Sequence, residues 1–354
     1  MAVMPSTETA QSRDFPRNLA DLTPSWLSEV LNLPVAQVTA IDIGQGKGML
    51  GDVWRLRLDV LDDDPLEIVA KFSAARESTL PVARRAEIFE REINFYKTLA
   101  PHLRCRLPKV YGAWHDQERA EFLILMQLVH ADPSVDQKKG VSFEHAVQVM
   151  FELAALHSFD FEQNVAITNL ADVGSVERRT NQKFFIANGW DKLSELLGAA
   201  AVGVPNSHDL QEGITAAYDT LATFPRVLCH GDVRPDNLLF DLKGDSVVLI
   251  DWQGVTLGPR SWDIAYFLAQ ALTVSDRREW QDKLLSTYVA KSAELGQIVN
   301  ESELVATIGR AAWFSLAVAC SLFTVADTSQ PSTLALAASM GERAVKLLQD
   351  EHQI

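Results

Sequence analysis

The chain is poor in cysteine and in positive charge, and each shortage excludes a class of protein. Its 354 residues include three cysteines, Cys105, Cys229 and Cys320, which are far apart and form no Cys-x-x-Cys pair. We therefore expect neither a disulfide framework nor a cysteine zinc site. We do expect a reducing, cytoplasmic location. The net charge of -15 and the pI near 5.0 argue against nucleic acid or membranes as partners, because both select basic surfaces.

The sequence also lacks an apolar run long enough to cross a membrane. The longest one, Ala311 to Ala326, falls short of the roughly 20 residues that a membrane helix needs, so a buried helix is expected there. Residues 1–18 are polar and lack the apolar core of a secretory signal, which favours a flexible leader. We find no internal repeat and no low-complexity segment.

What the chain does have is enough length and apolar content for two lobes. Hydrophobic residues make up 47% of the sequence. We expect a nucleotide-binding lobe over residues 19–128 and a larger catalytic and substrate-binding lobe over residues 129–354.

The most informative stretch is a predicted β-hairpin with polar residues at its edges. Two short apolar runs, 237–240 and 247–250, flank the turn-rich segment 241–245. Asp232 and Asn237 precede the first strand, and Asp251 ends the second. Pairing of the two strands would therefore bring these three oxygen-bearing side chains together.

These residue types fit the chemistry of phosphoryl transfer. Carboxylate and amide oxygens are ligands that Mg²⁺ accepts in proteins. Kinases use an Asn and a later Asp to hold the metal, while an earlier Asp serves the nucleophile. On this interpretation Asn237 and Asp251 bind Mg²⁺, and Asp232 is the catalytic base. Any one of the three alone would more often be a turn or cap residue, but their joint spacing favours a site.

A glycine-rich segment, Gly46-x-Gly48-x-x-Gly51, lies much earlier in the sequence than the predicted hairpin. The pattern also occurs in dinucleotide-binding folds, where it opens a helix. Here the following residues 53–60 alternate between apolar and charged, which predicts a strand. Strand, glycine loop and strand is the kinase arrangement, in which the backbone covers the ATP phosphates. The expected ATP-binding residues are Gly46, Lys47, Gly48 and Gly51. A glycine-rich hairpin without a ligand is the alternative.

A lysine and a glutamate follow the glycine loop in the order typical of kinases. Lys71 is the only cation of the predicted strand 66–72, and it could contact the α and β phosphates if a helical carboxylate held it. The predicted helix 86–96 offers Glu92, next to an apolar face, with Glu87 as runner-up. A solvated surface charge is the ordinary interpretation of either residue alone.

Two further predicted strands, 107–114 and 120–126, lead to a hinge that begins with Gln127 and Leu128, whose backbone is expected to bind adenine. From residue 143 onward the periodicity is mainly helical. His157 lies on an apolar helical face and is expected to be a buried structural histidine. Residues 160–224 match no motif, and Arg310 and Trp313 are acceptor-pocket candidates by position alone.

The motifs His230-Gly231-Asp232-x-x-x-x-Asn237 and Ile250-Asp251-Trp252 resemble the catalytic core of the aminoglycoside phosphotransferase and choline kinase superfamily. Gln253 and the glycine loop are most similar to its ecdysteroid-kinase-like branch. The resemblance implies a two-lobed, protein-kinase-like α+β fold. Its first lobe would be an antiparallel sheet with one main helix, and its larger second lobe would be mostly α-helical. It also implies that Asp263 is structural and holds the catalytic loop.

The sequence therefore favours an ATP- and Mg²⁺-dependent kinase that phosphorylates a hydroxyl of a small molecule, an alcohol or an amino alcohol. No Ala-Pro-Glu segment follows Asp251, and Asp263 comes only twelve positions later, so a protein-kinase activation segment has no room. One alternative is a metal-dependent hydrolase using His230, Asp232, Asp236 and Asp251 as ligands. Another is a nucleotide-binding pseudokinase.

Overall fold

The computed structural model describes residues 15–44, 51–73, 82–160, 170–243 and 245–354, with side chains described from residue 87 in the helix that begins at Val82. These residues form two compact units. Unit 1 comprises the chain up to Ile93 together with Lys109–Leu128, and unit 2 comprises Asn94–Pro108 and Val129–Ile354. This α+β organisation, with an antiparallel sheet in unit 1 and mostly helices in unit 2, is the predicted fold class.

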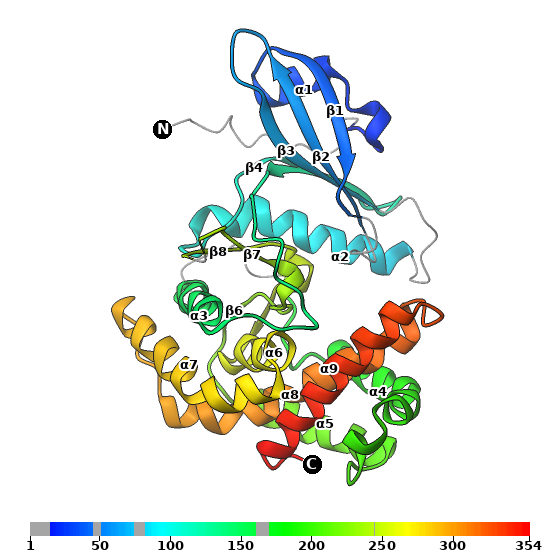
Figure 1. The fold of residues 1–354 in the computed structure, drawn as a ribbon, viewed down its shortest axis with the longest axis vertical. Helices are drawn as coiled ribbons and strands as arrows, with labels where there is room; N and C mark the ends of the chain where they lie inside the picture. The colour runs from blue at the N-terminus through cyan, green and yellow to red at the C-terminus, as the bar shows by residue number, and fades with distance from the viewer. Residues whose placement is uncertain (1–14, 45–50, 74–81, 161–169, 244) are drawn as a thin grey trace. The chain divides into compact units, whose positions relative to one another are not determined.

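Unit 1 is built on a five-stranded antiparallel sheet in the order β1-β2-β3-β5-β4 (Figure 1). The strands are β1 (Val35–Asp42), β2 (Gly51–Val60), β3 (Leu66–Ser73), β4 (Val110–Asp116) and β5 (Glu121–Gln127). Helix α1 (Pro24–Leu31) begins after Thr23, whose hydroxyl accepts a hydrogen bond from the Trp26 N–H at 3.2 Å. The main helix is α2 (Val82–Asn94).

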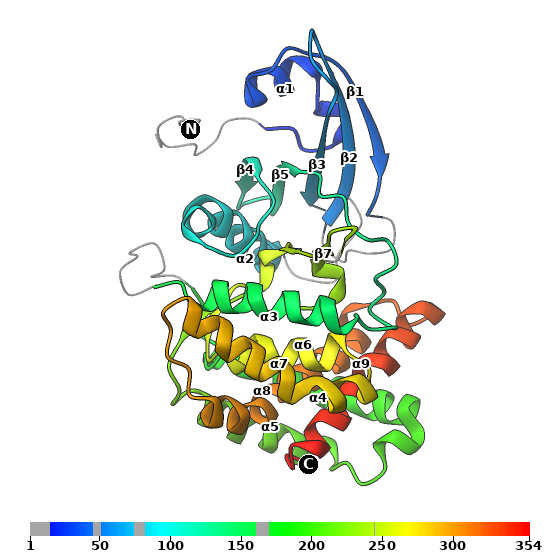
Figure 2. The ribbon, with the colours of Figure 1, turned by 60° about the vertical axis from the view of Figure 1, so that its left-hand side comes forward.

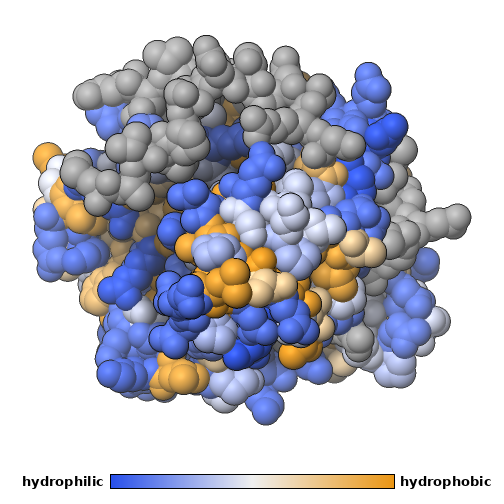
Figure 3. Space-filling view, turned by 90° about the horizontal axis from the view of Figure 1, so that it is seen from above, coloured by the Kyte–Doolittle hydropathy of each residue, from blue (hydrophilic) through white to orange (hydrophobic). Residues whose placement is uncertain are grey.

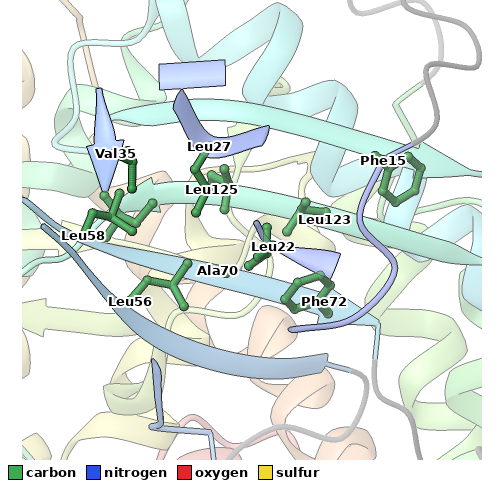
Figure 4. Close-up of a cluster of buried hydrophobic side chains, with 11 residues drawn as sticks. Phe15, Leu22, Leu27, Val35, Leu56, Leu58, Ala70, Phe72, Leu123 and Leu125 are labelled. Atoms are coloured by element: carbon green, nitrogen blue, oxygen red, sulfur yellow. The ribbon is translucent and has the colours of Figure 1, made fainter. Parts of the chain in front are cut away.

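The core of unit 1 lies between the sheet and the N-terminal segment. Leu56 and Leu58 on β2 alternate with partly exposed or exposed residues, so one face of the strand is buried. Phe15 packs into this cluster (Figure 4) and is 6% exposed. Arg17 pairs with Glu121 at 3.1 Å. Residues 15–18 therefore belong to the folded unit. The prediction of a flexible leader over residues 1–18 is wrong for these four residues.

Unit 2 is dominated by helices, and α3, α6 and α7 lie side by side (Figure 2). The long helices are α3 (Phe143–His157), α4 (Val176–Leu197), α5 (Ser207–Leu221), α6 (Ser261–Ala271), α7 (Val274–Glu294), α8 (Glu301–Val325) and α9 (Pro331–Asp350). Four short strands pair as β6 (Val227–Cys229) with β9 (Thr256–Gly258), and β7 (Leu238–Phe240) with β8 (Val247–Leu249). The predicted hairpin is thus present.

Helix α8 explains the long apolar run of the sequence. Among the described residues it is the one helix long and apolar enough to cross a membrane, and 72% of its most apolar window is buried inside the fold. Its neighbours include α4, α6 and α9. Burial against these helices accounts for its composition, as the sequence predicts.

Several helices begin earlier than their apolar periodicity suggests. Helix α7 starts at Val274, where the Thr273 hydroxyl accepts a hydrogen bond from the Asp276 N–H at 3.2 Å and caps a polar first turn. Helix α9 starts at Pro331, whose fixed φ suits the first helical position. Caps and first turns lie outside the apolar stripe, so periodicity does not detect them.

The segment 94–108, expected in the first lobe, belongs to unit 2. Helix α2 continues into a π-helical turn, Phe95–Leu99, and the Phe95 ring stacks on Trp252 with centroids 3.8 Å apart and planes 7° apart. Further along, the Leu249 N–H donates to the Arg106 carbonyl at 3.1 Å, and the Arg106 N–H donates to Glu152 at 2.6 Å. These contacts tie the segment to the predicted metal-binding hairpin.

On the face seen in Figure 3, hydrophilic residues predominate and hydrophobic residues form scattered patches. Most large apolar side chains of the described residues are inside the two units.

Trp252 is the clearest test of packing in unit 2, because it is fully buried between Phe95 and His230. Trp252→Ala should lower the free energy of unfolding by about 3–5 kcal/mol, the usual cost of truncating a buried aromatic residue. Urea denaturation followed by circular dichroism measures this. Phe184→Ala, at a side chain that is 54% exposed, is the control and should change stability by less than about 0.5 kcal/mol. Equal effects in the two variants would contradict the packing role of Trp252.

Candidate functional site

The predicted catalytic loop is held in place by one buried carboxylate. Strand β6 pairs with β9, and this pairing brings the start of α6 next to the residues that follow β6. Asp263 on α6 is fully buried and accepts two backbone hydrogen bonds, from the His230 N–H at 2.7 Å and from the Gly231 N–H at 2.8 Å. The loop that carries Asp232 is therefore fixed by Asp263, the role that the family resemblance implies.

Gly231 and His230 fix the direction of the loop. Gly231 has φ of 81°, and a Cβ there would collide with the carbonyl oxygen of Gly254, so only glycine fits. The His230 ring bridges two backbone groups: Nε2 lies 2.9 Å from the Ile250 carbonyl, and Nδ1 accepts from the Asp232 N–H at 3.2 Å. These partners define a neutral imidazole protonated at Nε2. Both ring nitrogens are thus engaged by backbone, which leaves neither for a metal ion.

The Asp232 carboxylate accepts hydrogen bonds on both of its oxygens. Oδ1 accepts from the Tyr266 hydroxyl at 2.8 Å. Oδ2 accepts from the Asn237 amide at 2.8 Å and from Arg234 Nε at 3.3 Å. Burial, reinforced by the charge of Asp232, raises the pKa of Tyr266 well above its usual value, so this phenol remains a neutral donor. The carboxylate is therefore held in a defined orientation.

Asn237 and Asp251 carry side-chain oxygen atoms that could hold a magnesium ion. The Asn237 amide nitrogen donates to the Asp232 carbonyl at 2.9 Å as well as to the Asp232 carboxylate, so its oxygen is directed away from them. The Ile250 N–H donates to the Asn237 carbonyl at 3.1 Å, which places Asp251 one residue from this contact. An amide oxygen and a carboxylate are hard oxygen ligands of the kind that Mg²⁺ prefers.

Asp251 adopts an unusual backbone conformation, with φ of 63° and ψ of 70°. This left-handed region is uncommon for residues other than glycine, and Asp is among those that tolerate it best. The adjacent Trp252 is fully buried and donates from Nε1 to the Leu249 carbonyl at 3.3 Å. Packing of Trp252 therefore holds the backbone that carries the Asp251 carboxylate.

In unit 1, the predicted lysine and glutamate form an ion pair. Lys71 on β3 lies with Nζ 2.8 Å from both carboxylate oxygens of Glu92 on α2. The Glu92 side chain is 1% exposed and the Lys71 side chain 12%. Glu87, the alternative partner, is on the exposed side of the same helix. The fold thus pairs Lys71 with Glu92.

The remaining predicted nucleotide-binding residues are placed only in part. Gly46, Lys47 and Gly48 lie outside the described residues. Gly51 opens β2 and pairs with Ser73 on β3. At the predicted hinge, the Gln127 N–H donates to the Lys109 carbonyl at 2.7 Å, so this N–H is not available to adenine, and Leu128 follows the end of β5.

Tyr266 and Arg234 both contact Asp232, although no sequence motif predicts a role for either of them. Arg234 also donates to Asp236 at 2.9 Å and to the Gln137 side chain at 3.1 Å. In the sequence, Tyr266 follows Asp263 by three residues and places a hydroxyl within a mostly apolar helical segment. This hydroxyl is the one sign of its role. Such a hydroxyl needs a buried partner, but the sequence does not show which one.

His157 is buried, as predicted, and links Asp263 to α7. Its Nδ1 lies 2.9 Å from the Tyr288 hydroxyl, and its Nε2 lies 3.3 Å from the Asp263 carboxylate. Burial lowers the pKa of His157 below its usual value, although the Asp263 carboxylate opposes this shift. The histidine therefore supports the loop in its neutral form.

This lowered pKa predicts a pH dependence of stability. The folded protein binds a proton at His157 less readily than the unfolded chain, whose histidines titrate near about 6.5. The contribution of His157 should therefore be complete above about pH 6.5 and be lost as the pH falls below it. Urea denaturation at pH 7.5 and 5.5 measures the loss. It should be smaller in His157→Gln, which keeps hydrogen-bonding groups without the titration. His208→Gln, at an exposed position, should behave as the wild type. Identical pH profiles for His157→Gln and wild type would contradict this account.

The chain is similar to known proteins in sequence and in fold. The ecdysteroid kinase-like family matches residues 45–301, a span that contains Lys71, Glu92, Asp232, Asn237 and Asp251. The Arabidopsis thaliana "Probable acyl-CoA dehydrogenase IBR3" is 26% identical over 199 residues, which are 51% of this chain and 22% of that protein. The Caenorhabditis elegans "Uncharacterized kinase-like protein D1044.1" is 37% identical over 65 residues, which are 18% of this chain and 17% of that protein. The chain thus spans less than a quarter of the length of these curated relatives.

Solved structures show the same fold at low identity. The choline kinase LicA from Streptococcus pneumoniae has a TM-score of 0.52 at 15% identity, with 92% of this chain and 97% of that chain covered. The Plasmodium vivax ethanolamine kinase has a TM-score of 0.52 at 12% identity, with 89% and 82% covered. The GDP and kanamycin complex of APH(2")-IIia has a TM-score of 0.50 at 14% identity, with 93% and 97% covered. Because the family match covers well over half of the sequence, the chain belongs to the ecdysteroid kinase-like family.

Proposed function

We propose that this protein is an ATP- and Mg²⁺-dependent kinase that transfers the γ-phosphoryl group to a hydroxyl of a small molecule. The observation that carries the proposal is the Asp232 carboxylate, fixed by Tyr266 and Asn237 on a loop that Asp263 holds. The family match supports it, since it covers the motifs of both units. The compact path from Asp251 to Asp263, a single turn followed by β9, favours a small acceptor over a protein.

In this reaction Asp232 orients the acceptor hydroxyl and accepts its proton. The new bond joins the acceptor oxygen to the γ-phosphorus, and the bond between that phosphorus and the bridging oxygen breaks, so ADP leaves. Lys71, positioned by Glu92, would contact the α and β phosphates, and the glycine segment 46–51 would cover them. Asn237 and Asp251 would hold Mg²⁺, which neutralises phosphate charge when bound. Catalysis then depends mainly on alignment and on electrostatic stabilisation.

The hydrolase alternative loses support from the His230 contacts. It requires His230 as a metal ligand, whereas both of its ring nitrogens face backbone groups of the same unit. A hydrolase also leaves the Lys71–Glu92 pair without a role. A cytoplasmic location remains part of the proposal. It is supported by the three cysteines, which are buried and form no disulfide bond.

The role of Asp232 can be tested by Asp232→Asn. Loss of the base should reduce acceptor-dependent ATP turnover by about 1,000-fold, within the range typical of general bases, with nucleotide affinity nearly unchanged. Turnover is measured by ADP release over a library of alcohols, and nucleotide binding by calorimetry. Asp236→Asn is the matched control, because Asp236 contacts the same Arg234 but neither Tyr266 nor Asn237. Wild-type turnover in Asp232→Asn would remove Asp232 as the base.

The role of Lys71 can be tested by Lys71→Met. Loss of the ammonium should lower kcat/KM for ATP by about 100-fold, as removal of one electrostatic contact to a reacting phosphate typically does. Because this change leaves the buried Glu92 carboxylate without that cation, the double variant Lys71→Met with Glu92→Gln separates folding from function. The double variant should regain stability without regaining activity. Normal ATP kinetics in either variant would remove Lys71 from the site.

A further inference from the structure

The two oxygen atoms of the Asp232 carboxylate are supported by different parts of unit 2. Oδ1 accepts from the Tyr266 hydroxyl on α6 at 2.8 Å. Oδ2 accepts from Arg234 Nε at 3.3 Å, in addition to its contact with the Asn237 amide. The orientation of the carboxylate therefore depends on where α6 and the Arg234 guanidinium are held.

Gln137 fixes the Arg234 guanidinium to the rest of unit 2. Arg234 Nη1 donates to the Asp236 carboxylate at 2.9 Å and to the Gln137 side-chain oxygen at 3.1 Å. The Asp236 side chain is 39% exposed, and it belongs to the same loop as Arg234 and Asp232, so it moves with them. Gln137 is 4% exposed and comes from a separate segment of the chain. It is therefore the contact that holds the guanidinium relative to the core.

Gln137 lies in a tight turn that is docked on the end of α6. The Gly140 N–H donates to the Asp136 carbonyl at 3.0 Å, and Gly140 has φ of 83°, a conformation that favours glycine. The Val141 N–H then donates to the carbonyl of Ala271, the last residue of α6, at 2.9 Å. The position of this turn is therefore set by α6.

Arg343 on α9 joins the turn to α6. Its Nη1 donates to the Gln137 carbonyl at 2.8 Å and to the Gln270 carbonyl at 3.0 Å, and its Nη2 donates to the Lys138 carbonyl at 2.7 Å. Gln270 is in the last turn of α6, where carbonyl groups lack partners within the helix. Tyr266 lies four residues earlier on the same helix. One buried side chain thus connects the supports of both carboxylate oxygens.

The contacts of Arg343 need the shape of a guanidinium. Burial lowers the pKa of Arg343, and the nearby carboxylates of Glu342, Asp276 and Asp136 oppose this shift. An arginine side chain stays protonated in proteins and offers five N–H donors in a planar fork. A lysine offers one nitrogen at the end of a flexible stem, so it cannot reproduce donors at two fixed positions.

We propose that Gln137 and Arg343 are positioning residues for phosphoryl transfer, although neither contacts Asp232. Gln137 holds Arg234 against Oδ2 of the base. Arg343 sets the spacing between Gln137 and the helix that carries Tyr266. A shift of either support would turn the carboxylate away from the acceptor hydroxyl, and a misplacement of about 1 Å can cost roughly 100-fold in rate. This inference rests on the proposed function and deepens it.

Gln137→Met tests the contact with Arg234, because it removes the accepting oxygen and keeps nearly the same shape. The Gln137 amide nitrogen has no partner among the described residues, so the substitution breaks one side-chain hydrogen bond there. The kcat should fall about tenfold with the KM of ATP unchanged, since the alignment of the base alone is disturbed. Gln137→Glu keeps an acceptor oxygen for the guanidinium and should stay within about threefold of the wild-type kcat.

Gln281→Met is the matched control for Gln137→Met. Gln281 on α7 also accepts from an arginine, Arg277 Nη1, at 3.3 Å, and it donates to Glu351 at 2.7 Å, away from Asp232. This variant should keep the wild-type kcat. A wild-type kcat in Gln137→Met, or a loss that Gln137→Glu fails to restore, would overturn the role of Gln137.

Arg343→Lys tests the connection between the turn and α6. Its kcat should fall at least about tenfold with the KM of ATP unchanged, because both supports lose their common donor. Arg277→Lys is the control, since Arg277 is 4% exposed and also ties α9 to the fold, through Asp350 at the end of that helix. It should lower the melting temperature and leave kcat unchanged. Equal losses of kcat in the two lysine variants would overturn the role of Arg343.

The double variant Gln137→Met with Arg343→Lys shows whether the two residues act along one path. If they do, its kcat should equal that of Arg343→Lys alone. Losses that multiply would overturn the shared path. Turnover is measured as ADP release over the library of alcohols, at a temperature where circular dichroism shows each variant folded. No turnover by the wild-type protein with any alcohol would reject the proposed function, whereas wild-type turnover with unchanged kcat in the variants would reject this inference alone.

Discussion

The pair of hydrogen bonds from the His230 and Gly231 N–H groups to the Asp263 carboxylate is the constraint on which the candidate site depends. Both donors and the carboxylate are buried. Loss of either hydrogen bond would therefore leave a buried polar group without a partner, which costs stability. The positive φ of Gly231 then turns the chain so that Asp232 leaves the core. The conformation of the loop therefore follows from a helix that begins thirty residues later in the sequence.

A second layer of contacts supports the first. Trp252 fills the space between Phe95 and His230, and it fixes the backbone next to Asp251. The segment 94–108 adds main-chain contacts to β8 and α3 through Arg106. The site is thus built on packed aromatic rings and backbone pairing rather than on a flexible loop, and such support is what holds catalytic groups in a defined geometry.

Much of the fold class and the site could be predicted because the relevant residues follow one another at short, fixed spacings. Asp232, Asn237 and Asp251 are recognisable from a hairpin pattern, and Lys71 with Glu92 from their order on a strand and a helix. Tyr266 could not be found in this way. Its hydroxyl matters because it donates to the Asp232 carboxylate, and this contact depends on how α6 packs against a loop distant in sequence. The end of the leader was misjudged for the same reason, since Phe15 is buried by tertiary contacts alone.

The contacts of Arg343 have a consequence for the order in which the protein matures. This residue lies in α9, yet its guanidinium donates hydrogen bonds to the carbonyl groups of Gln137 and Lys138, about two hundred positions earlier. During synthesis on the ribosome, the nascent chain can assemble unit 1 and the early helices while α9 is still inside the exit tunnel. The contacts of Arg343 therefore form only after α9 has left the tunnel, and until then the carbonyl groups of Gln137 and Lys138 lack this hydrogen-bond donor.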